Sequence, residues 1–175
     1  MTGKTVFRIL MIALGILTVD MISKALTHFY IAPYELASHF FPFGGINVFQ
    51  AYGIDFCIHH VTNKGIAWGL GSGIQELILF VRIVVIAGLI IYLKRSPKAY
   101  PQRYPLVLII AGGIGNIVDY FIYGHVVDMF HFILRGYSYP VFNVADTSIF
   151  FGIITLLLKS WKKTSKQDAA SKIPS

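Results

Sequence analysis

The chain has 175 residues, of which 55% are hydrophobic and 13% charged, and its formal net charge is +7. Soluble domains carry about 25% charged residues, so this composition excludes an ordinary soluble domain and a disordered chain. Cys57 is the only cysteine, which excludes a disulfide-stapled secreted domain. The apolar excess and the placement of the positive charges favour a membrane rather than a nucleic acid as the partner.

Four segments approach the roughly 20 apolar residues that an α-helix needs to cross a bilayer. Each is apolar on all sides, as expected of a helix in lipid. We therefore predict an all-α membrane protein with four transmembrane helices in a single domain over residues 1–161. The predicted spans are residues 7–24, 74–93, 104–123 and 140–158. We expect the first to be an uncleaved helix, because no small-residue cleavage pattern follows it.

The positions of Lys and Arg predict the orientation of these helices. Eleven of the 15 basic residues precede the first span, join the second to the third, or follow the fourth. Those three segments share one side of a four-span protein, so both termini are predicted to be cytoplasmic. Residues 162–175 are polar and basic, and we expect a disordered tail near anionic headgroups.

The longest segment between spans, residues 25–73, falls on the outer side of the membrane in this topology. It contains aromatic and β-branched runs at residues 39–43, 46–49 and 54–61, broken by Gly and Pro. Such runs predict a small antiparallel sheet between the first and second spans. Its aromatic residues suit the membrane interface, so we expect a platform in partial contact with lipid.

Acidic residues gather near the predicted outer ends of three helices. Spacings of three or four residues place both members of a pair on one helical face. The pairs are Asp20 with Lys24, Asn116 with Asp119, and Asn143 with Asp146. Asp128 follows the third span, and all these groups are predicted to lie at a similar depth. The sequence leaves open whether Asp20 and Lys24 form only a local ion pair.

Asp128 and Asp146 have no nearby basic residue in the sequence except Arg135, which we expect to lie out in a loop. Ionisable groups at membrane depth usually face a partner or a water-filled cavity. Two carboxyl groups close together favour sharing one proton, because their charges repel. The ionised member can then deprotonate water while the protonated one activates a carbonyl. This chemistry is that of an aspartic protease.

Five short motifs make the chain resemble the bacterial lipoprotein signal peptidases, which are four-span membrane aspartic proteases (type II signal peptidases). The motifs occur in the family's order and span residues 20–149. They are Asp20–Lys24, Asn63–Gly69, Gly112–Asp119, Gly124–Asp128 and Phe142–Asp146. The resemblance implies a protease of the bacterial inner membrane that cleaves a prolipoprotein before its diacylglyceryl-modified cysteine.

The resemblance also implies roles for individual residues. Asp128 and Asp146 would be the catalytic pair, near the outer face of the membrane. Asn116, Asn143 and Ala145 would shape the site, Asn63 would hold substrate, and Asp20, Lys24 and Asp119 would be supporting polar residues. No metal or cofactor is expected, and the partners would be the lipid-modified substrate and membrane lipid, with the enzyme acting as a monomer.

Three features depart from the family's pattern. Tyr120 stands where the family usually has Arg, so Arg135 or Lys64 would have to supply a cation near the site. Trp68 replaces the usual Phe, and the segment 35–61 is longer than the common form. The substrate contacts made by that segment therefore cannot be transferred.

Two other readings compete with this one. His125, Asp128 and His131 recur every three residues and could bind zinc, with His59 and His60 in the outer segment, although no His-Glu-x-x-His pattern is present. Buried acids in four spans could also belong to a small proton- or ion-coupled transporter or to a subunit of a larger complex. A transporter would place such acids near the midplane, commonly within repeated halves, and no internal repeat is visible here.

Overall fold

The computed structural model describes residues 3–65, 74–96 and 103–171. Four helices in these ranges are long and apolar enough to cross a membrane. They are α1 (Gly3–Tyr30), α2 (Gln75–Arg95), α3 (Arg103–Tyr123) and α4 (Val144–Ser171), and the apolar part of α4 ends at Trp161. The predicted number of spans is confirmed, and each observed helix overlaps its predicted span.

The fourth helix differs most from its prediction. It begins at Val144 rather than at residue 140, because Phe142 is still bridged to Phe130 of the sheet. It also continues to Ser171, where the sequence predicted a disordered tail from residue 162. Residues 162–171 contain neither Gly nor Pro, so nothing in their composition stops a helix.

Helix α3 is the centre of the bundle and contacts each of the other three helices. Half of its apolar stretch is buried, against 6% of that of α2. Gly112 of α3 approaches α4 so closely that a Cβ atom there would overlap the backbone oxygen of Ala145. Outward-facing side chains such as Phe80 and Phe150 are 63% and 58% exposed, as expected of surfaces that face lipid.

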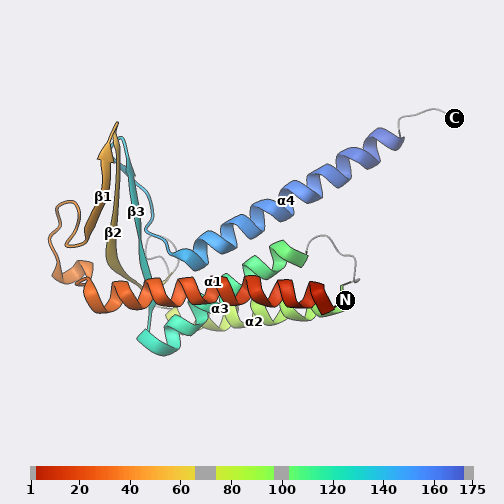
Figure 1. Cartoon of the computed structure of the whole chain (residues 1–175), viewed down its shortest axis with the longest axis horizontal. Coiled ribbons are helices and arrows are strands. Elements are labelled where there is room, and N and C mark those ends of the chain that lie inside the picture. The colour runs from red at the N-terminus through yellow and green to blue at the C-terminus, as the bar shows by residue number, and fades with distance from the viewer. Residues whose placement is uncertain (1–2, 66–73, 97–102, 172–175) are drawn as a thin grey trace.

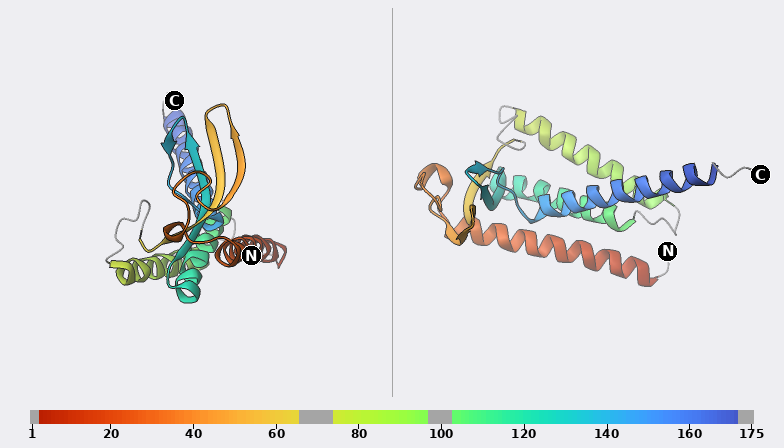
Figure 2. Two further views of the ribbon diagram at one scale, coloured as in Figure 1. Left: turned by 90° about the vertical axis from the view of Figure 1, so that its left-hand side faces the viewer. Right: turned by 90° about the horizontal axis from the view of Figure 1, so that it is seen from above.

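A four-stranded antiparallel sheet lies at one end of the helices (Figures 1 and 2). Its strands are β1 (Ile46–Ala51), β2 (Ile54–Asn63), β3 (Val126–Leu134) and β4 (Tyr137–Ser138), in that spatial order. A short 3-10 helix, η1 (Tyr34–Leu36), connects α1 to the sheet. The predicted sheet of residues 25–73 therefore exists, as the hairpin β1–β2.

The other half of the sheet corrects the all-α prediction. Strands β3 and β4 come from the segment between α3 and α4, for which the sequence predicted no strand. Residues 126–134 are rich in β-branched and aromatic side chains, which favour strands. Their first four positions are all buried, so the alternation that reveals a half-exposed strand is absent. The fold thus combines helices with a sheet built from two distant segments.

Both hairpins turn tightly at two residues with positive φ. These are Tyr52 and Gly53 (57° and 74°) between β1 and β2, and Arg135 and Gly136 (49° and 83°) between β3 and β4. Two such residues form the turn whose twist matches that of the strands. The Arg135 backbone N–H donates to the Gly53 oxygen at 2.6 Å, so the two turns meet at one tip of the sheet.

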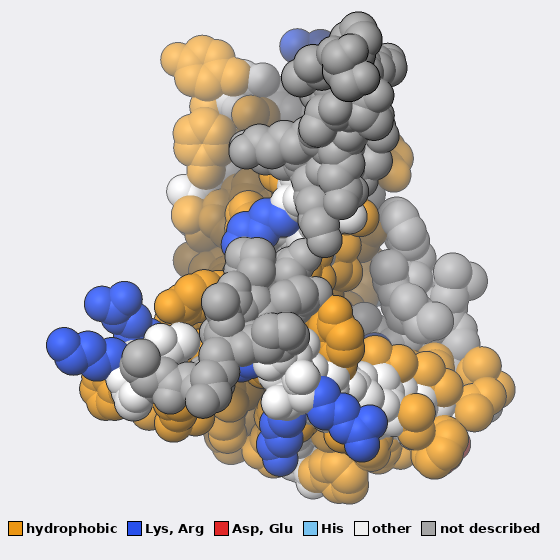
Figure 3. All heavy atoms as spheres, turned by 90° about the vertical axis from the view of Figure 1, so that its right-hand side faces the viewer, with side chains coloured by type: hydrophobic (Ala, Val, Ile, Leu, Met, Phe, Trp, Pro, Cys, Tyr) orange, Lys and Arg blue, Asp and Glu red, His pale blue; other side chains and the backbone are white. Residues whose placement is uncertain are grey.

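The end of the bundle opposite the sheet is basic. The first turns of α1 and the last turn of α2 lie at this end (Figure 2), and they carry the exposed Lys4, Arg8, Lys94 and Arg95. Figure 3 shows the molecule from this end, with Lys and Arg side chains on its surface. The described basic residues of the N-terminal segment and of the end of α2 therefore lie on the same side of the molecule.

Candidate active site

Asp128 lies on β3, where the sheet meets the helices, and is 1% exposed. Its two carboxylate oxygens accept hydrogen bonds from two amide side chains. The Asn63 Nδ2 group, at the end of β2, donates to Oδ2 at 2.8 Å, and the Asn143 Nδ2 group donates to Oδ1 at 2.7 Å. Burial and the nearby Asp146 carboxylate raise the pKa of Asp128, which favours its protonated form at neutral pH.

Asp146 lies in the first turn of α4, where Asn143 precedes the helix. The Asn143 Oδ1 atom accepts from the backbone N–H of Asp146 at 2.8 Å, and Asp146 Oδ2 accepts from the backbone N–H of Asn143 at 3.3 Å. This reciprocal pair is a capping box, which satisfies N–H groups that have no partner within the helix. The Asn-x-x-Asp spacing therefore encodes a helix start here, rather than two residues on one helical face.

Asn116 of α3 links the second aspartate to the interior of the bundle. Its Nδ2 group donates to Asp146 Oδ1 at 2.8 Å, and its Oδ1 atom accepts from Lys24 Nζ at 3.0 Å and Asn143 Nδ2 at 3.2 Å. The amides of Asn116 and Asn143 thus connect Asp128 and Asp146 in one hydrogen-bond network. The predicted convergence of polar groups from three helices is confirmed, and the sheet contributes to it as well.

Lys24 is fully buried between two carboxylates. Its Nζ atom lies 2.7 Å from Asp20 of its own helix and 2.7 Å from Asp119 of α3. Asp20 also accepts from the backbone N–H of Ala145 at 2.7 Å, beside the capping box of α4. The Asp20–Lys24 pair is therefore more than a local ion pair, because it joins α1, α3 and the start of α4.

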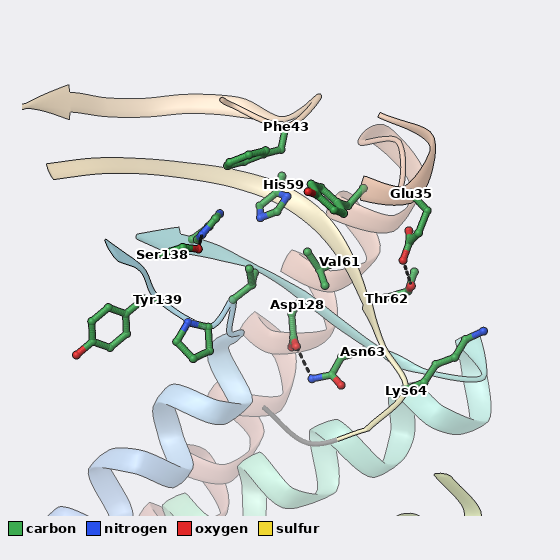
Figure 4. Close-up of a pocket in the computed structure, with 14 residues that line it drawn as sticks. Glu35, Phe43, His59, Val61, Thr62, Asn63, Lys64, Asp128, Ser138 and Tyr139 are labelled. Atoms are coloured by element: carbon green, nitrogen blue, oxygen red, sulfur yellow. Dashed lines mark hydrogen bonds between the residues drawn. The ribbon is translucent and has the colours of Figure 1, made fainter. Parts of the chain in front are cut away.

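A pocket of about 570 Å³ opens beside Asp128 (Figure 4). Asn63 and Asp128 lie at one side of it, and Phe43, His59 and Tyr139 lie along the rest of the wall. Most of these wall residues were not predicted as site residues. The aromatic residues of the run at 39–43 were noticed in the sequence, but we expected them to contact the membrane interface rather than to line a pocket.

A family model described as signal peptidase (SPase) II matches residues 12–162 of the chain. The chain belongs to the signal peptidase II family. It is a protease, and the predicted family and activity are confirmed.

Two relatives named lipoprotein signal peptidase illustrate the similarity. The Chlamydia pneumoniae protein is 40% identical over 116 residues, which are 65% of this chain and 68% of the relative. The Bacillus subtilis protein is 37% identical over 119 residues, which are 64% of this chain and 76% of the relative. The similarity to proteins of this name supports lipoprotein processing as the function.

Two solved structures of bacterial membrane enzymes share the fold. They superpose with TM-scores of 0.73 and 0.69, both at 24% identity. The aligned parts cover 91% and 87% of this chain, and 90% and 91% of those structures. The four helices and the sheet are therefore an architecture that this signal peptidase II chain shares with membrane enzymes of known structure.

The structure does not assemble the zinc ligands considered from the sequence. His125 lies near His28 and His60, whereas His131 lies near Cys57 and His59. Within the described part of the chain, Asp128 belongs to neither of these clusters, and its hydrogen bonds come from amides. A zinc-activated water at His125, Asp128 and His131 is therefore not supported.

Of the two cations expected near Tyr120, Lys64 lies there and Arg135 does not. Arg135 lies at the tip of the sheet, away from the aspartates. Arg82 of α2 and Tyr120 line one small cavity together with Lys64, and the Arg82 guanidinium donates to the Gly65 oxygen at 3.0 Å. Trp68 lies outside the described residues. Arg82 and Lys64 therefore bring positive charge to the side where the family usually has Arg.

Replacing Lys24 by Met should destabilise this protease by about 3–5 kcal/mol, because Asp20 and Asp119 would remain buried without their counter-charge. Thermal unfolding in detergent would measure the loss. Lys4→Met, at an exposed position of the same helix, is the matched control and should leave the unfolding temperature unchanged. Equal effects of the two substitutions would contradict the role of Lys24.

Proposed function

We propose that this signal peptidase II cleaves prolipoproteins before a diacylglyceryl-modified cysteine, with Asp128 and Asp146 as the catalytic pair. One observation carries this proposal. Carboxylates from β3 and α4 meet in a single network whose donors are amides, with the side chain of Asn143 contacting Asp128 and the backbone of Asp146. Amide donors orient both carboxylates without neutralising them by a cation, so the pair can exchange protons with a substrate.

The reaction follows from one proton shared by two carboxyl groups. The ionised carboxylate removes a proton from water, and the oxygen of that water bonds to the scissile carbonyl carbon. The protonated carboxyl group donates its proton to the carbonyl oxygen, which gives a neutral tetrahedral intermediate. The C–N bond then breaks as the nitrogen of the lipid-bearing cysteine takes up a proton. The signal peptide leaves as an acid, and one shared proton remains on the pair.

The remaining site residues serve this pair in the proposal. Asn63 holds substrate beside Asp128, to which it already donates a hydrogen bond. Asn116 and Asn143 orient the carboxylates, while Ala145, Asp20, Lys24 and Asp119 hold the start of α4 against α1 and α3. The pocket beside Asp128 receives the peptide segment around the scissile bond. One chain supplies every group of the network, which supports a monomer as the working unit.

The chain lies in the bacterial cytoplasmic membrane in this proposal, with both termini in the cytoplasm. The exposed Lys4, Arg8, Lys94 and Arg95 lie at the end opposite the sheet, and positive charge favours the cytoplasmic side. The sheet, its pocket and the aspartate pair then lie at the outer face. A translocated prolipoprotein, anchored in the bilayer by its acyl chains, would reach the pair there.

Asp128→Asn and Asp146→Asn should each lower cleavage of a diacylglyceryl-modified prolipoprotein by about 10²–10⁴-fold or more, because each removes one acid or base. Cleavage would be followed with purified protein in detergent. Asp55→Asn, an acid of the same sheet on β2, is the matched control and should cleave normally. A precursor without the lipid should be a poor substrate for every variant. Full cleavage by either Asp128 or Asp146 variant would refute the pair.

The ratio kcat/KM should fall at alkaline pH, because the aspartate pair then loses its shared proton. The amide of Asn63 stabilises the Asp128 carboxylate and so opposes the rise that burial imposes on its pKa. Asn63→Ala removes this donor, which raises the pKa further and should move the alkaline limb to higher pH. Asn47→Ala, on β1, should leave the limb in place. A shift of the Asn63→Ala limb to lower pH would contradict the assignment.

The orientation can be tested by labelling single cysteines in spheroplasts, starting from a Cys57→Ser background. Val48→Cys on β1, at a position that is 50% exposed, should react with a membrane-impermeant maleimide from outside. Lys4→Cys at the start of α1 should react only after the membrane is permeabilised. The opposite pattern would invert the proposed topology.

A further inference from the structure

Three histidines from separate elements converge where α1 meets the sheet. His28 lies in the last turn of α1, His60 lies on β2, and His125 directly precedes β3. One ring nitrogen of each lies within 4.8 Å of those of the other two. The sequence gives little sign of this meeting, because 32 and 65 residues separate consecutive members of the trio (28 to 60 and 60 to 125).

The three rings leave buried nitrogen atoms without partners. His28 Nδ1, His60 Nε2 and His125 Nε2 are buried and have no hydrogen-bond partner among the described residues. His60 itself is 1% exposed. A buried polar atom without a partner destabilises the folded state, so three such atoms at one place call for a common ligand.

His60 is oriented as a metal ligand would be. Its Nδ1 atom lies 3.0 Å from the backbone oxygen of Ile31, which can only accept a hydrogen bond. Nδ1 therefore carries the proton, and the lone pair of Nε2 is free. A hydrogen bond from the other ring nitrogen to a backbone oxygen is the usual support of a metal-binding histidine. Burial lowers the pKa of both His60 and His125, so these rings are neutral at pH 7 and can donate lone pairs.

We propose that His28, His60 and His125 bind a Zn²⁺ ion through three imidazole nitrogens. Three neutral imidazoles with a fourth position open to water form a donor set that Zn²⁺ accepts, with Zn–N bonds of about 2.0–2.1 Å. Glu35 is close enough to interact electrostatically with His60 and His125, and its negative charge favours a cation there. Neither Asp128 nor Asp146 is among its ligands.

A second cluster, Cys57, His59 and His131, is the natural competitor for the ion. Burial raises the pKa of the Cys57 thiol to about 11, so Zn²⁺ would have to displace a tightly held proton there, whereas neutral imidazoles bind without losing one. His131 Nε2 is also 2.8 Å from the Ser138 hydroxyl. The imidazole trio is therefore the better site, and the two clusters can be told apart because only one contains sulfur.

The ion would fasten three elements beside the proposed active site. His60 lies three residues before Asn63 on β2, and His125 lies three residues before Asp128. A bond from each to one ion, together with His28, would fix both strands against the end of α1. The proposed role is therefore to position the part of the sheet that carries Asn63 and Asp128.

The test uses the full chain in detergent, purified with a tag that contains no histidine and stripped of metal with a chelator. Titration with Co²⁺, a spectroscopic substitute for Zn²⁺, should give the absorption bands of a four-coordinate site at one ion per chain, without a sulfur-to-metal charge-transfer band. Elemental analysis should find one Zn²⁺ per reloaded chain. Zn²⁺ should also raise the unfolding temperature, because a ligand that binds the folded state stabilises it.

His60→Gln and His125→Gln should abolish the Co²⁺ spectrum, whereas His59→Gln, at the neighbouring position in the other cluster, should keep it. The proposal would be overturned if His60→Gln and His125→Gln both kept the Co²⁺ spectrum. A sulfur-to-metal charge-transfer band in the wild type, or folded wild-type protein that binds no Co²⁺, would overturn it as well. The wild-type spectrum decides the ligand type even where a variant does not fold. Cleavage is not the readout, so this result is independent of the test of the aspartate pair.

Discussion

The side chain of Asn143 is the contact on which the arrangement of this site depends. Its oxygen caps α4 by accepting from the backbone of Asp146, and its NH₂ group donates to Asp128 on β3. One amide therefore determines where a membrane helix begins and where the sheet lies against it. Because Asn143 has no exposed surface, water cannot replace either bond without opening the contact between sheet and bundle.

The positive charge of Lys24 offsets part of the negative charge of the acidic residues buried at this depth of the bundle. One ammonium group contacts Asp20 and Asp119 directly and reaches Asp146 through the Asn116 amide. Asp128 is linked to the same network through amides only, and burial favours its protonated form. The bundle thus pairs the two carboxylates that hold helices together with one ammonium group, and leaves the proposed catalytic pair without a direct ion pair.

Close helix packing brings these groups into range. Gly115 of α3 faces Asp20 of α1 and Ala145 of α4, and a Cβ atom there would lie 2.5 Å from the Asp20 carboxylate. The glycines of α3 let three backbones approach one another, as small residues do in membrane helix interfaces. The Asp20 carboxylate can therefore reach both Lys24 and the backbone of Ala145.

The sequence by itself determined the four spans, the resemblance to a protease family and the residues of the polar network. These features follow from local composition and from short motifs, such as the apolar runs and the Asn-x-x-Asp pattern before α4. Only the tertiary structure decided that Asp128 lies on a strand, that Lys24 pairs with Asp119 as well as Asp20, and that His28, His60 and His125 meet. Strand β3 is buried at its first positions and pairs with β2, more than 60 residues earlier, so neither periodicity nor spacing reveals it. The register of that distant pairing sets which polar side chains face one another, and no local pattern encodes it.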